Sequence, residues 1–598
     1  MPESIASPSG TLRADLSVSP GEGLTLTVIR ASEVVLSVRR LGVLEPAVSA
    51  ADVTLGARTD RTVADSFTTV TGKRLEHVHT ANETSLRISA SAVVDVRVSD
   101  DGVAYRYRLG GSGSITSEGA EFSLPEPARL WLAEYMPNNE GMFRPAIAAG
   151  SIPGAARFSF PGLAETPEGS WCLLTEAAVT ETTPGAHLRS LGSARFALDF
   201  PGESIETGES WTSPWRVAIV GDLPSVVAST LVTALNSPSR IEDTSWIRPG
   251  RAAWSWWSEF YSPRDLDRQK AYVDFAAAQG WEFCLVDARW DPDWVAELVQ
   301  YARDRGVDIL IWSHWTTLAT QDQRDELLPR WKSWGVAGIK VDFMDSESQE
   351  QMAWYESLAT DAATHRLMVN YHGSTIPKGR QRTWPHVMTY EGILGAEQYV
   401  RPSLPEGEVM VPWQDGPNPI HNTIVPFTRN IVGSMDYTPV VFSAPRRVST
   451  AAHELAQAVV YESGWQHYAD SIEAYQARPL AAAVLRDVPA AWDETRLLAG
   501  RPGEYVVMAR RRGPHWWIGC LSAGAPREVH VPLELLDGAA GSVCLIQDAP
   551  RESWQGNPRP EDPAAELVES RHTLSATDSL TVPLRADGGF VAHLEVTA

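Results

Sequence analysis

The segment from Gly338 to Asp345 combines a strand-like apolar pattern with charged side chains. Apolar residues alternate with Lys340 and Asp342, and a second carboxylate, Asp345, ends the segment. A period of two predicts a β-strand. A charge inside a buried strand costs free energy unless it is paired or used. Asp342 is therefore expected to pair with Lys340, to cap the next helix, or to carry chemistry.

Polar side chains also follow the neighbouring strand-like segments. If these segments form one parallel sheet, their carboxyl ends meet at a single edge. Carboxylates and aromatic rings would then converge from several strands. A functional site explains this convergence more simply than solvation or core packing does. The candidates are Asp287, Arg289, Asp291, Trp312, His314, Asn370, Tyr371, His372, Glu391, Glu397 and Asp436.

Two facing carboxylates among aromatic residues favour glycoside hydrolysis. One carboxylic acid protonates the leaving oxygen, and a second carboxylate acts as nucleophile or as base toward water. The 23 Trp residues fit a protein that stacks on sugar rings. The residue types leave two other readings open: an aldolase or isomerase that uses Lys340 as base or Schiff-base amine, and a metal-dependent hydrolase of another ester or amide.

The elements that position these residues begin near Arg251. Strand-like segments alternate there with helical patterns, which predicts βα units with right-handed crossovers. Two weaker units, residues 431–437 and 462–470, bring the count to eight. We expect a (β/α)8 TIM barrel over residues 246–485 rather than a doubly wound sheet. The helices are expected at 266–278, 294–305, 325–334, 349–364 and 453–461.

All-β regions are expected on both sides of the barrel. Residues 1–245 show short alternating runs that predict a large antiparallel β-sandwich, followed by a linker helix at Val226–Leu235. Residues 486–598 return to this pattern and predict a smaller antiparallel β-sandwich without a cluster of catalytic residue types. The chain is thus predicted to be multidomain, with α/β and β parts.

Composition excludes several classes of partner. The formal net charge of −24 disfavours nucleic acids and anionic membranes. No apolar run is long enough to span a bilayer and no signal peptide is visible, so a cytoplasmic location is expected unless an export signal was removed. The four cysteines form no CxxC pair, although Cys520 and Cys544 would be able to pair in an exported protein. The oligomeric state stays open.

Several short motifs, in this order and spacing, resemble glycoside hydrolase family 97 over nearly the whole chain. The resemblance implies an N-terminal β-super-sandwich, a catalytic (β/α)8 barrel and a C-terminal β-domain. It also implies an exo-acting α-glycosidase that depends on Ca²⁺. The motifs are Ser255-Trp256-Trp257, residues 281–287, residues 338–345, His372-Gly373 with residues 381–385, residues 390–397, Val425–Arg429 with residues 435–439, and Trp492–Arg496.

The same resemblance assigns roles to three glutamates. Glu397 matches the family's general acid and Glu391 a calcium ligand. Glu176, in a Leu-Thr-Glu-Ala context, matches the ligand that reaches in from the N-terminal domain. Glu397 is also expected as a metal ligand, although a nearby divalent cation lowers the pKa of a carboxyl that an acid needs raised.

The family's two mechanistic branches differ in their second carboxylate. The inverting α-glucosidase branch has a base carboxylate after the fifth strand, where this chain has Tyr371-His372-Gly373, whereas the retaining branch has a strand-end Asp, as at Asp342. We therefore expect a retaining α-galactosidase with Asp342 as nucleophile. The alternatives are a β-L-arabinopyranosidase, an inverting α-glucosidase with Asp345 as base, and a non-catalytic carbohydrate-binding relative.

The rest of the sugar pocket is expected from four residues. Lys340 lies two positions before Asp342 on the same face, where it favours the ionised carboxylate and reaches a substrate hydroxyl. Asp287, Trp312 and Asn370 are the other candidates. Each also has an ordinary structural explanation, because Asp and Asn cap helices and Trp packs cores.

Overall fold

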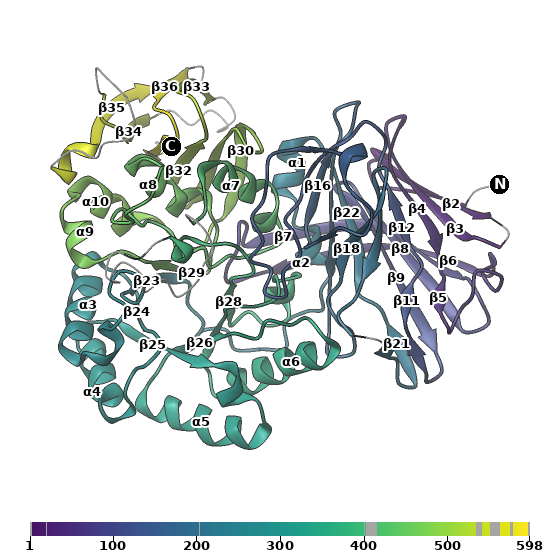
Figure 1. The fold of residues 1–598 in the computed structure, drawn as a ribbon, viewed down its shortest axis with the longest axis horizontal. Coiled ribbons are helices and arrows are strands. Elements are labelled where there is room, and N and C mark those ends of the chain that lie inside the picture. Colours follow the sequence, from purple (N-terminus) through teal and green to yellow (C-terminus); the bar gives the residue numbers. More distant parts are fainter. Residues whose placement is uncertain are drawn as a thin grey trace.

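The computed structural model describes residues 3–19, 21–202, 204–399, 401, 416–533, 541–550, 562–574 and 578–595. Figure 1 shows three parts: a large β-region at the N-terminal end, a central α/β part, and a smaller β-region at the C-terminal end. No helix in these ranges is both long enough and apolar enough to cross a membrane. All four cysteines are free thiols, so the pairing considered for Cys520 and Cys544 is not formed.

The N-terminal part contains two large antiparallel sheets whose apolar faces contribute to one continuous core. The first sheet has the order β1 (Glu3–Ala6), β2 (Leu12–Ser19), β3 (Gly23–Arg30), β4 (Glu33–Leu41), β12 (Glu121–Ser123), β19 (Arg195–Asp199), β18 (His187–Gly192), β15 (Arg157–Phe158). The second has the order β14 (Ile147–Ala148), β13 (Arg129–Trp131), β16 (Gly162–Glu165), β17 (Trp171–Ala177), β22 (Trp215–Gly221), β9 (Gly102–Gly110), β8 (Ala92–Ser99), β7 (Glu76–Arg87), β6 (Arg58–Thr68), with β21 (Ser210–Thr212) also beside β9.

The predicted linker helix is broken into two short helices, α1 (Leu223–Ala228) and α2 (Leu231–Ala234). Ser229 interrupts it with an extended backbone (φ −57°, ψ 137°), and its hydroxyl donates to Asp101 Oδ2 at 2.6 Å. This tertiary hydrogen bond offers the serine an alternative to the helix ladder.

The central part is a parallel sheet of seven strands that nearly closes into a barrel, as the βα pattern predicted. Its order is β28 (Val387–Tyr390), β27 (Met368–Tyr371), β26 (Gly338–Asp342), β25 (Asp308–His314), β24 (Phe283–Val286), β23 (Gly250–Trp254), β29 (Trp465–Tyr468). The remaining gap is spanned by residue 435, which forms one parallel bridge to Tyr390 and donates its N–H to Glu462 O at 3.0 Å. The predicted strand at 431–437 is thus reduced to this bridge.

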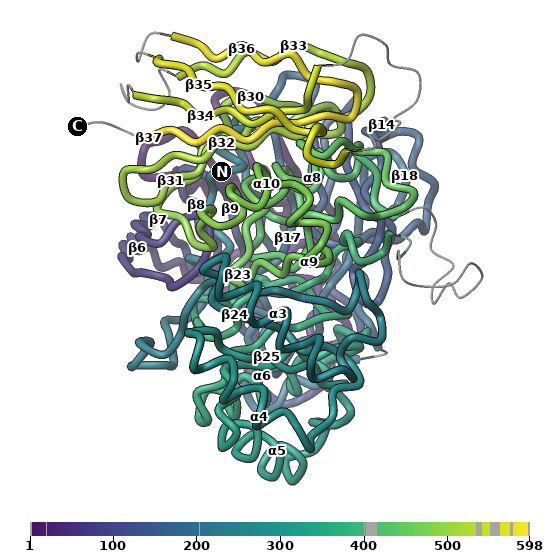
Figure 2. Tube along the Cα trace, turned by 90° about the vertical axis from the view of Figure 1, so that its left-hand side faces the viewer, coloured from purple at the N-terminus to yellow at the C-terminus, as the bar shows by residue number. Residues whose placement is uncertain are grey.

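Helices surround the outer face of this sheet (Figures 1 and 2). The helix α5 begins four residues before the predicted start, because Thr320 forms a capping box with Gln323 and the polar first turn carries no apolar periodicity. The helices are α3 (Leu266–Gln279), α4 (Pro292–Arg303), α5 (Gln321–Trp334), α6 (Gln349–Thr364), α7 (Pro419–Ile424), α8 (Ala451–Val460), α9 (Ile472–Gln476) and α10 (Pro479–Asp487).

The C-terminal part has its own apolar core, built from antiparallel strands. It packs against α8 at the outside of the barrel, and Figure 2 shows it at the end of the molecule opposite α4 and α5. One sheet has the order β30 (Glu494–Arg501), β31 (Tyr505–Arg512), β32 (His515–Ser522), β37 (Gly589–Glu595), β34 (Gly541–Asp548), β35 (Leu567–Leu574), and the other pairs β33 (Arg527–Pro532) with β36 (Ser579–Leu584).

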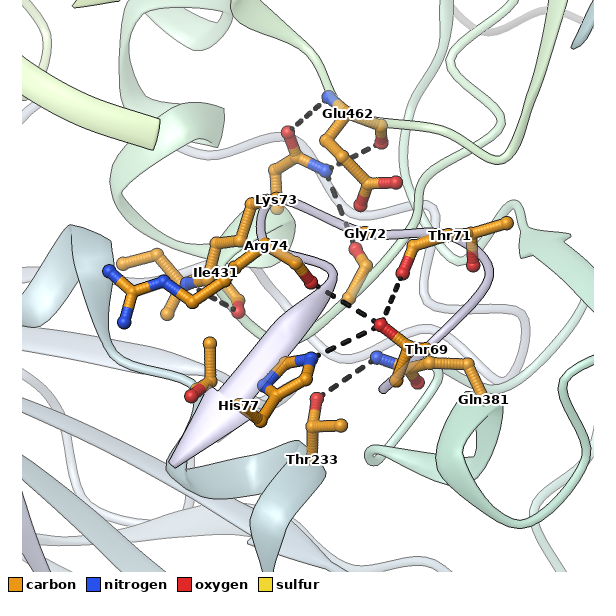
Figure 3. A pocket seen from close by; sticks show the side chains of 13 residues that line it. Thr69, Thr71, Gly72, Lys73, Arg74, His77, Thr233, Gln381, Ile431 and Glu462 are labelled. Atoms are coloured by element: carbon orange, nitrogen blue, oxygen red, sulfur yellow. Dashed lines mark hydrogen bonds between the residues drawn. The ribbon is translucent and has the colours of Figure 1, made fainter. Parts of the chain in front are cut away.

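A small polar cavity of about 20 Å³ lies where the turn between β6 and β7 meets the barrel (Figure 3). Thr69, Lys73 and His77 line it from the N-terminal part, and Gln381 and Glu462 from the barrel. Because Glu462 precedes β29, the cavity lies at the amino end of that strand, away from the strand ends where barrel chemistry takes place. Its size suits a water molecule rather than a substrate.

Candidate active site

Asp342 is the last residue of β26 and lies among the carboxyl ends of its neighbours. The parallel register places His314 beside Asp342, and Trp312 and Asn370 on either side of Lys340. All five residues of β26 are buried. The predicted convergence of strand ends is therefore present.

The Asp342 carboxylate is held by two N–H donors. Trp312 Nε1 donates to Oδ2 at 2.9 Å, and the backbone N–H of Phe343 donates to Oδ1 at 2.7 Å. Phe343, the residue that follows the strand, has a left-handed backbone (φ 66°). Burial raises the pKa of Asp342, but the charges of His372 and Lys340 and the hydrogen bond from Trp312 outweigh it and lower that pKa to about 2.

His372 is the centre of a cluster of four carboxylates. Its Nδ1 lies 2.9 Å from Glu391 Oε2 and 3.7 Å from Asp342 Oδ2. Its Nε2 lies 3.6 Å from both Glu397 Oε2 and Asp436 Oδ2. Burial opposes the imidazolium, but the surrounding negative charges raise the pKa of His372 well above its usual value. One ring thus separates Asp342 from Glu397.

Glu397 lies in a short 3-10 helix, Ala396–Gln398. The backbone N–H of Glu397 donates to Thr438 Oγ1 at 3.0 Å, and this hydrogen bond fixes the position of the helix. The Oε2 of Glu397 is buried and has no hydrogen-bond partner among the described residues. Burial, more than the opposing charge of His372, determines the pKa of this carboxyl and raises it to about 7. The two carboxyls beside His372 therefore prefer opposite protonation states near neutral pH.

Lys340 contacts Asp287 rather than Asp342. Its Nζ lies 3.2 Å from Asp287 Oδ2, which also accepts from Trp254 Nε1 at 2.8 Å. Lys340 nevertheless contributes to the low pKa of Asp342 through its charge. Asp287 is thus the counter-ion that anchors Lys340 in the barrel.

Asn370 belongs to a second hydrogen-bonded group at the same strand ends. Its Nδ2 donates to Asp436 Oδ2 at 2.6 Å, and Asp436 Oδ1 lies 3.0 Å from His467 Nδ1. The Oδ1 of Asn370 is buried and lacks a partner among the described residues. The four predicted pocket residues therefore lie within two strands of Asp342.

Glu176 does not join this cluster, contrary to the predicted role as a metal ligand. Its Oε1 accepts from Lys378 Nζ and from the N–H of Ala186, and its Oε2 accepts from Arg216 Nη1. Lys378 also pairs with Glu347 at 2.8 Å. Both oxygens of Glu176 are thus occupied in a buried ion network that joins β17 to the loop after β27.

The N-terminal carboxylate that reaches the cluster is Glu140, which the sequence reasoning missed. It lies in the loop between β13 and β14, where Asn138 Nδ2 donates to Oε1 at 2.8 Å and Gln398 Nε2 to Oε2 at 3.3 Å. Burial and the charges of Glu391 and Glu397 raise its pKa well above the usual value. The one sequence signal was an acid within a polar turn, Asn138 to Gly141.

The donor set suits a hard cation. Ligand atoms of His372, Glu391 and Glu397 lie within 4.8 Å of one another. Glu391 Oε2 also accepts from the N–H of Gly373 at 2.6 Å, so its orientation is fixed. Carboxylate oxygens are the ligands that Ca²⁺ prefers, and a cation would relieve the repulsion that raises the pKa of Glu140. His372 is a less suitable Ca²⁺ ligand, and its positive charge compensates the same carboxylates.

Comparison with known proteins gives consistent results for all three parts. Residues 5–238 match the model for the glycosyl-hydrolase 97 N-terminal domain, residues 246–393 that for glycoside hydrolase 97, and residues 491–595 that for the glycosyl-hydrolase 97 C-terminal, oligomerisation domain.

Two relatives carry activity names. The chain is 40% identical over 616 residues to a probable retaining alpha-galactosidase of Streptomyces bingchenggensis, covering 99% of this chain and 91% of the relative. It is 27% identical to the retaining alpha-galactosidase of Bacteroides thetaiotaomicron, over 78% of this chain and 79% of that one. A crystal structure of a beta-arabinopyranosidase has the same fold, with a TM-score of 0.88, 24% identity and coverage of 99% and 100%. The chain is a glycoside hydrolase and belongs to glycoside hydrolase family 97.

Proposed function

We propose that this protein is an exo-acting, retaining α-galactosidase that depends on calcium. The observation that carries the proposal is the pair of buried carboxyls on either side of His372, with pKa values of about 2 for Asp342 and about 7 for Glu397. Near neutral pH Asp342 is ionised and Glu397 is substantially protonated. Glycoside hydrolysis needs one carboxylate as nucleophile and one carboxylic acid as proton donor.

The reaction follows from these protonation states. Ionised Asp342 attacks the anomeric carbon while Glu397 donates its proton to the leaving oxygen, so the C–O bond breaks as a glycosyl ester forms. Glu397, now a carboxylate, removes a proton from water, and the hydroxide oxygen displaces Asp342. Two inversions return the original configuration. Trp312 and Lys340 keep Asp342 ionised before attack and after release.

The calcium ion would be held by Glu391 and Glu397, with Glu140 from the N-terminal part completing the carboxylate set. A bound Ca²⁺ would supply positive charge that orients sugar hydroxyls and offsets the charge of these three glutamates. Glu140 replaces Glu176 in this proposal, because both oxygens of Glu176 are already bonded to cationic or N–H groups.

A second candidate is β-L-arabinopyranosidase activity. It is favoured by the fold similarity to a beta-arabinopyranosidase, with a TM-score of 0.88. β-L-Arabinopyranose has the ring configuration of α-D-galactopyranose and lacks only the hydroxymethyl group, so one catalytic arrangement serves both sugars.

The test is to compare kcat/KM for the 4-nitrophenyl glycosides of α-D-galactopyranose, β-L-arabinopyranose and α-D-glucopyranose, with calcium present. The proposal expects the galactoside to be the best substrate and the glucoside the poorest. Preference for the arabinoside would support the second candidate. Preference for the glucoside, or no hydrolysis of any of the three, would refute both.

A further inference from the structure

A pocket lined by tryptophans lies beside the candidate active site, and of its wall residues only Trp312 takes part in the mechanism above. Its volume is about 330 Å³, and it is formed by the loop between β24 and α4, the end of β25, and α5. Its principal wall residues are Trp290, Trp312, His314, Arg330, Trp331 and Trp334, called here the tryptophan pocket. We propose that the tryptophan pocket is a second, non-catalytic binding site for a neutral oligosaccharide.

The aromatic surfaces are fixed in place and partly exposed. Trp290 Nε1 donates to the carbonyl oxygen of Trp312 at 2.7 Å, and the Trp290 ring stands edge-on to Trp331 and Trp334 at 6.4 and 6.1 Å between centroids. Trp290, Trp312 and Trp334 are only half-buried, although large apolar side chains are usually buried. Rigid, accessible indole faces are the surfaces on which the apolar faces of sugar rings stack.

The rim supplies hydrogen-bonding groups of the kind that sugar hydroxyls need. Thr317 and Arg330 are exposed at the edge, and the Arg330 guanidinium lies 5.1 Å from the centre of the Trp334 ring. Arg289 also lines the pocket, and the nearby exposed carboxylates of Asp291, at the N-cap of α4, and Asp293, in its first turn, offset its charge. With a net charge of −24 on the whole chain, a neutral ligand is favoured over an anion.

The pocket is continuous with the catalytic strand ends through Trp312. Trp312 lines the pocket, where its carbonyl oxygen accepts from Trp290, and its indole N–H donates to Asp342 Oδ2. His314 lines it too, and stacks on the exposed ring of Phe343 at 5.4 Å. An aromatic wall therefore leads from the tryptophan pocket to the residue that follows Asp342.

The stereochemistry of the reaction argues that the occupant is not the leaving group. In a double displacement the leaving group departs from the face opposite the nucleophile. The tryptophan pocket includes Trp312 and His314, which lie beside Lys340 and Asp342 in the sheet, whereas Glu397 lies across the His372 ring from Asp342. The occupant is therefore a sugar unit of a separate oligosaccharide molecule, not of the substrate being cleaved.

The choice of a carbohydrate as occupant rests on the proposed function, but the binding test does not require hydrolysis. The full-length protein is first titrated with 1-deoxygalactonojirimycin, an inhibitor that mimics galactose, to fill the catalytic site. Raffinose is then titrated, and binding is followed by tryptophan fluorescence and saturation-transfer NMR. Loss of inhibitor binding reports on the proposed function, whereas raffinose binding reports on the tryptophan pocket and is also read without inhibitor.

Two variants and one control make the test specific. Trp334→Ala removes a stacking face, and Thr317→Trp fills the pocket from an exposed position, so that the second variant remains informative if the first is unstable. Trp246→Ala removes a half-buried indole that tilts against His386, outside the pocket. We expect raffinose binding to weaken by about tenfold or more in both pocket variants and to stay unchanged in the control.

The same variants separate a second site from a leaving-group site. The proposal expects kcat/KM for 4-nitrophenyl α-D-galactopyranoside to stay within about twofold of the parent protein. It is overturned if the inhibitor-saturated protein shows no saturable raffinose binding, or if Thr317→Trp binds raffinose as well as the parent. A rise of about tenfold in KM for the aryl galactoside would also overturn it, because the pocket would then hold the leaving group.

Discussion

The indole N–H of Trp312 points at Asp342 Oδ2 from 2.9 Å away. This contact joins the ends of two adjacent strands and gives Trp312 a role beyond core packing. A hydrogen bond to a charged acceptor contributes about 1.5–3 kcal/mol, and it favours the ionised form that a nucleophile needs.

Trp312→Phe keeps an aromatic ring and removes only the donor. We expect kcat/KM to fall by about 10–100-fold, because the carboxylate loses one of its stabilising bonds. The pKa of Asp342 should also rise, which moves the acidic limb of the pH–rate profile to higher pH. Trp315→Phe, at a neighbouring position that contacts Trp354 instead, is the matched control. If the acidic limb of the Trp312→Phe profile were unchanged, the indole N–H of Trp312 would not control the ionisation of Asp342.

Asp342→Gly removes the nucleophile and leaves space. Hydrolysis should be lost, and azide should restore turnover of an activated aryl galactoside, because the anion enters where the carboxylate stood. Mass spectrometry should detect a galactosyl azide, and the coupling constant of its anomeric proton in NMR should show the inverted configuration. No rescue, or an azide of retained configuration, would count against Asp342.

The pH dependence of kcat/KM should be bell-shaped. Glu397 must be protonated, and burial raises its pKa to about 7, so activity should fall as pH rises through that value. A bound cation favours the carboxylate and would move this limb to lower pH. Asp342 stays ionised above its own pKa of about 2, so acid inactivation should come only far below neutrality. A rate that stays constant to about pH 9 would exclude Glu397 as the acid.

Calcium should stabilise the protein through the carboxylates near His372. At a concentration of about 100 Kd, a ligand that binds only the folded state adds about 2.7 kcal/mol, which calorimetry detects as a higher Tm. Glu391→Gln and Glu140→Gln should reduce the calcium-induced rise in Tm. Glu176→Gln should keep that rise even though its basal Tm is lower. If Glu176→Gln abolished the calcium-induced rise in Tm and Glu140→Gln kept it, Glu176 rather than Glu140 would be the calcium ligand.

Lys378 should matter for stability more than for binding calcium. Lys378→Met leaves Glu176 and Glu347 facing each other's negative charge in a buried place, at a cost of about 3–5 kcal/mol. The Tm should fall clearly, and the double variant with Glu176→Gln should recover part of the loss. Equal Tm values for parent and Lys378→Met would mean that the ion network contributes nothing to stability.

The sequence predicted the parallel strands well because their apolar runs recur between amphipathic helices. Asp342 was found in the same way, since a charge in a buried strand is conspicuous. Glu140 was missed because it lies in an irregular loop between strands of the N-terminal part, and only the packing of that loop brings it beside Gln398. Glu176 was predicted as a metal ligand from the family resemblance, and nothing in the sequence indicated that Lys378 and Arg216 bond its two oxygens.

The configuration of the first sugar released tests the double displacement most directly. 4-Nitrophenyl α-D-galactopyranoside is mixed with the enzyme, and the anomeric proton of the product is followed by NMR before mutarotation. The account predicts that α-galactose appears first. Initial release of β-galactose would mean a single displacement by water and would contradict the role of Asp342 as nucleophile.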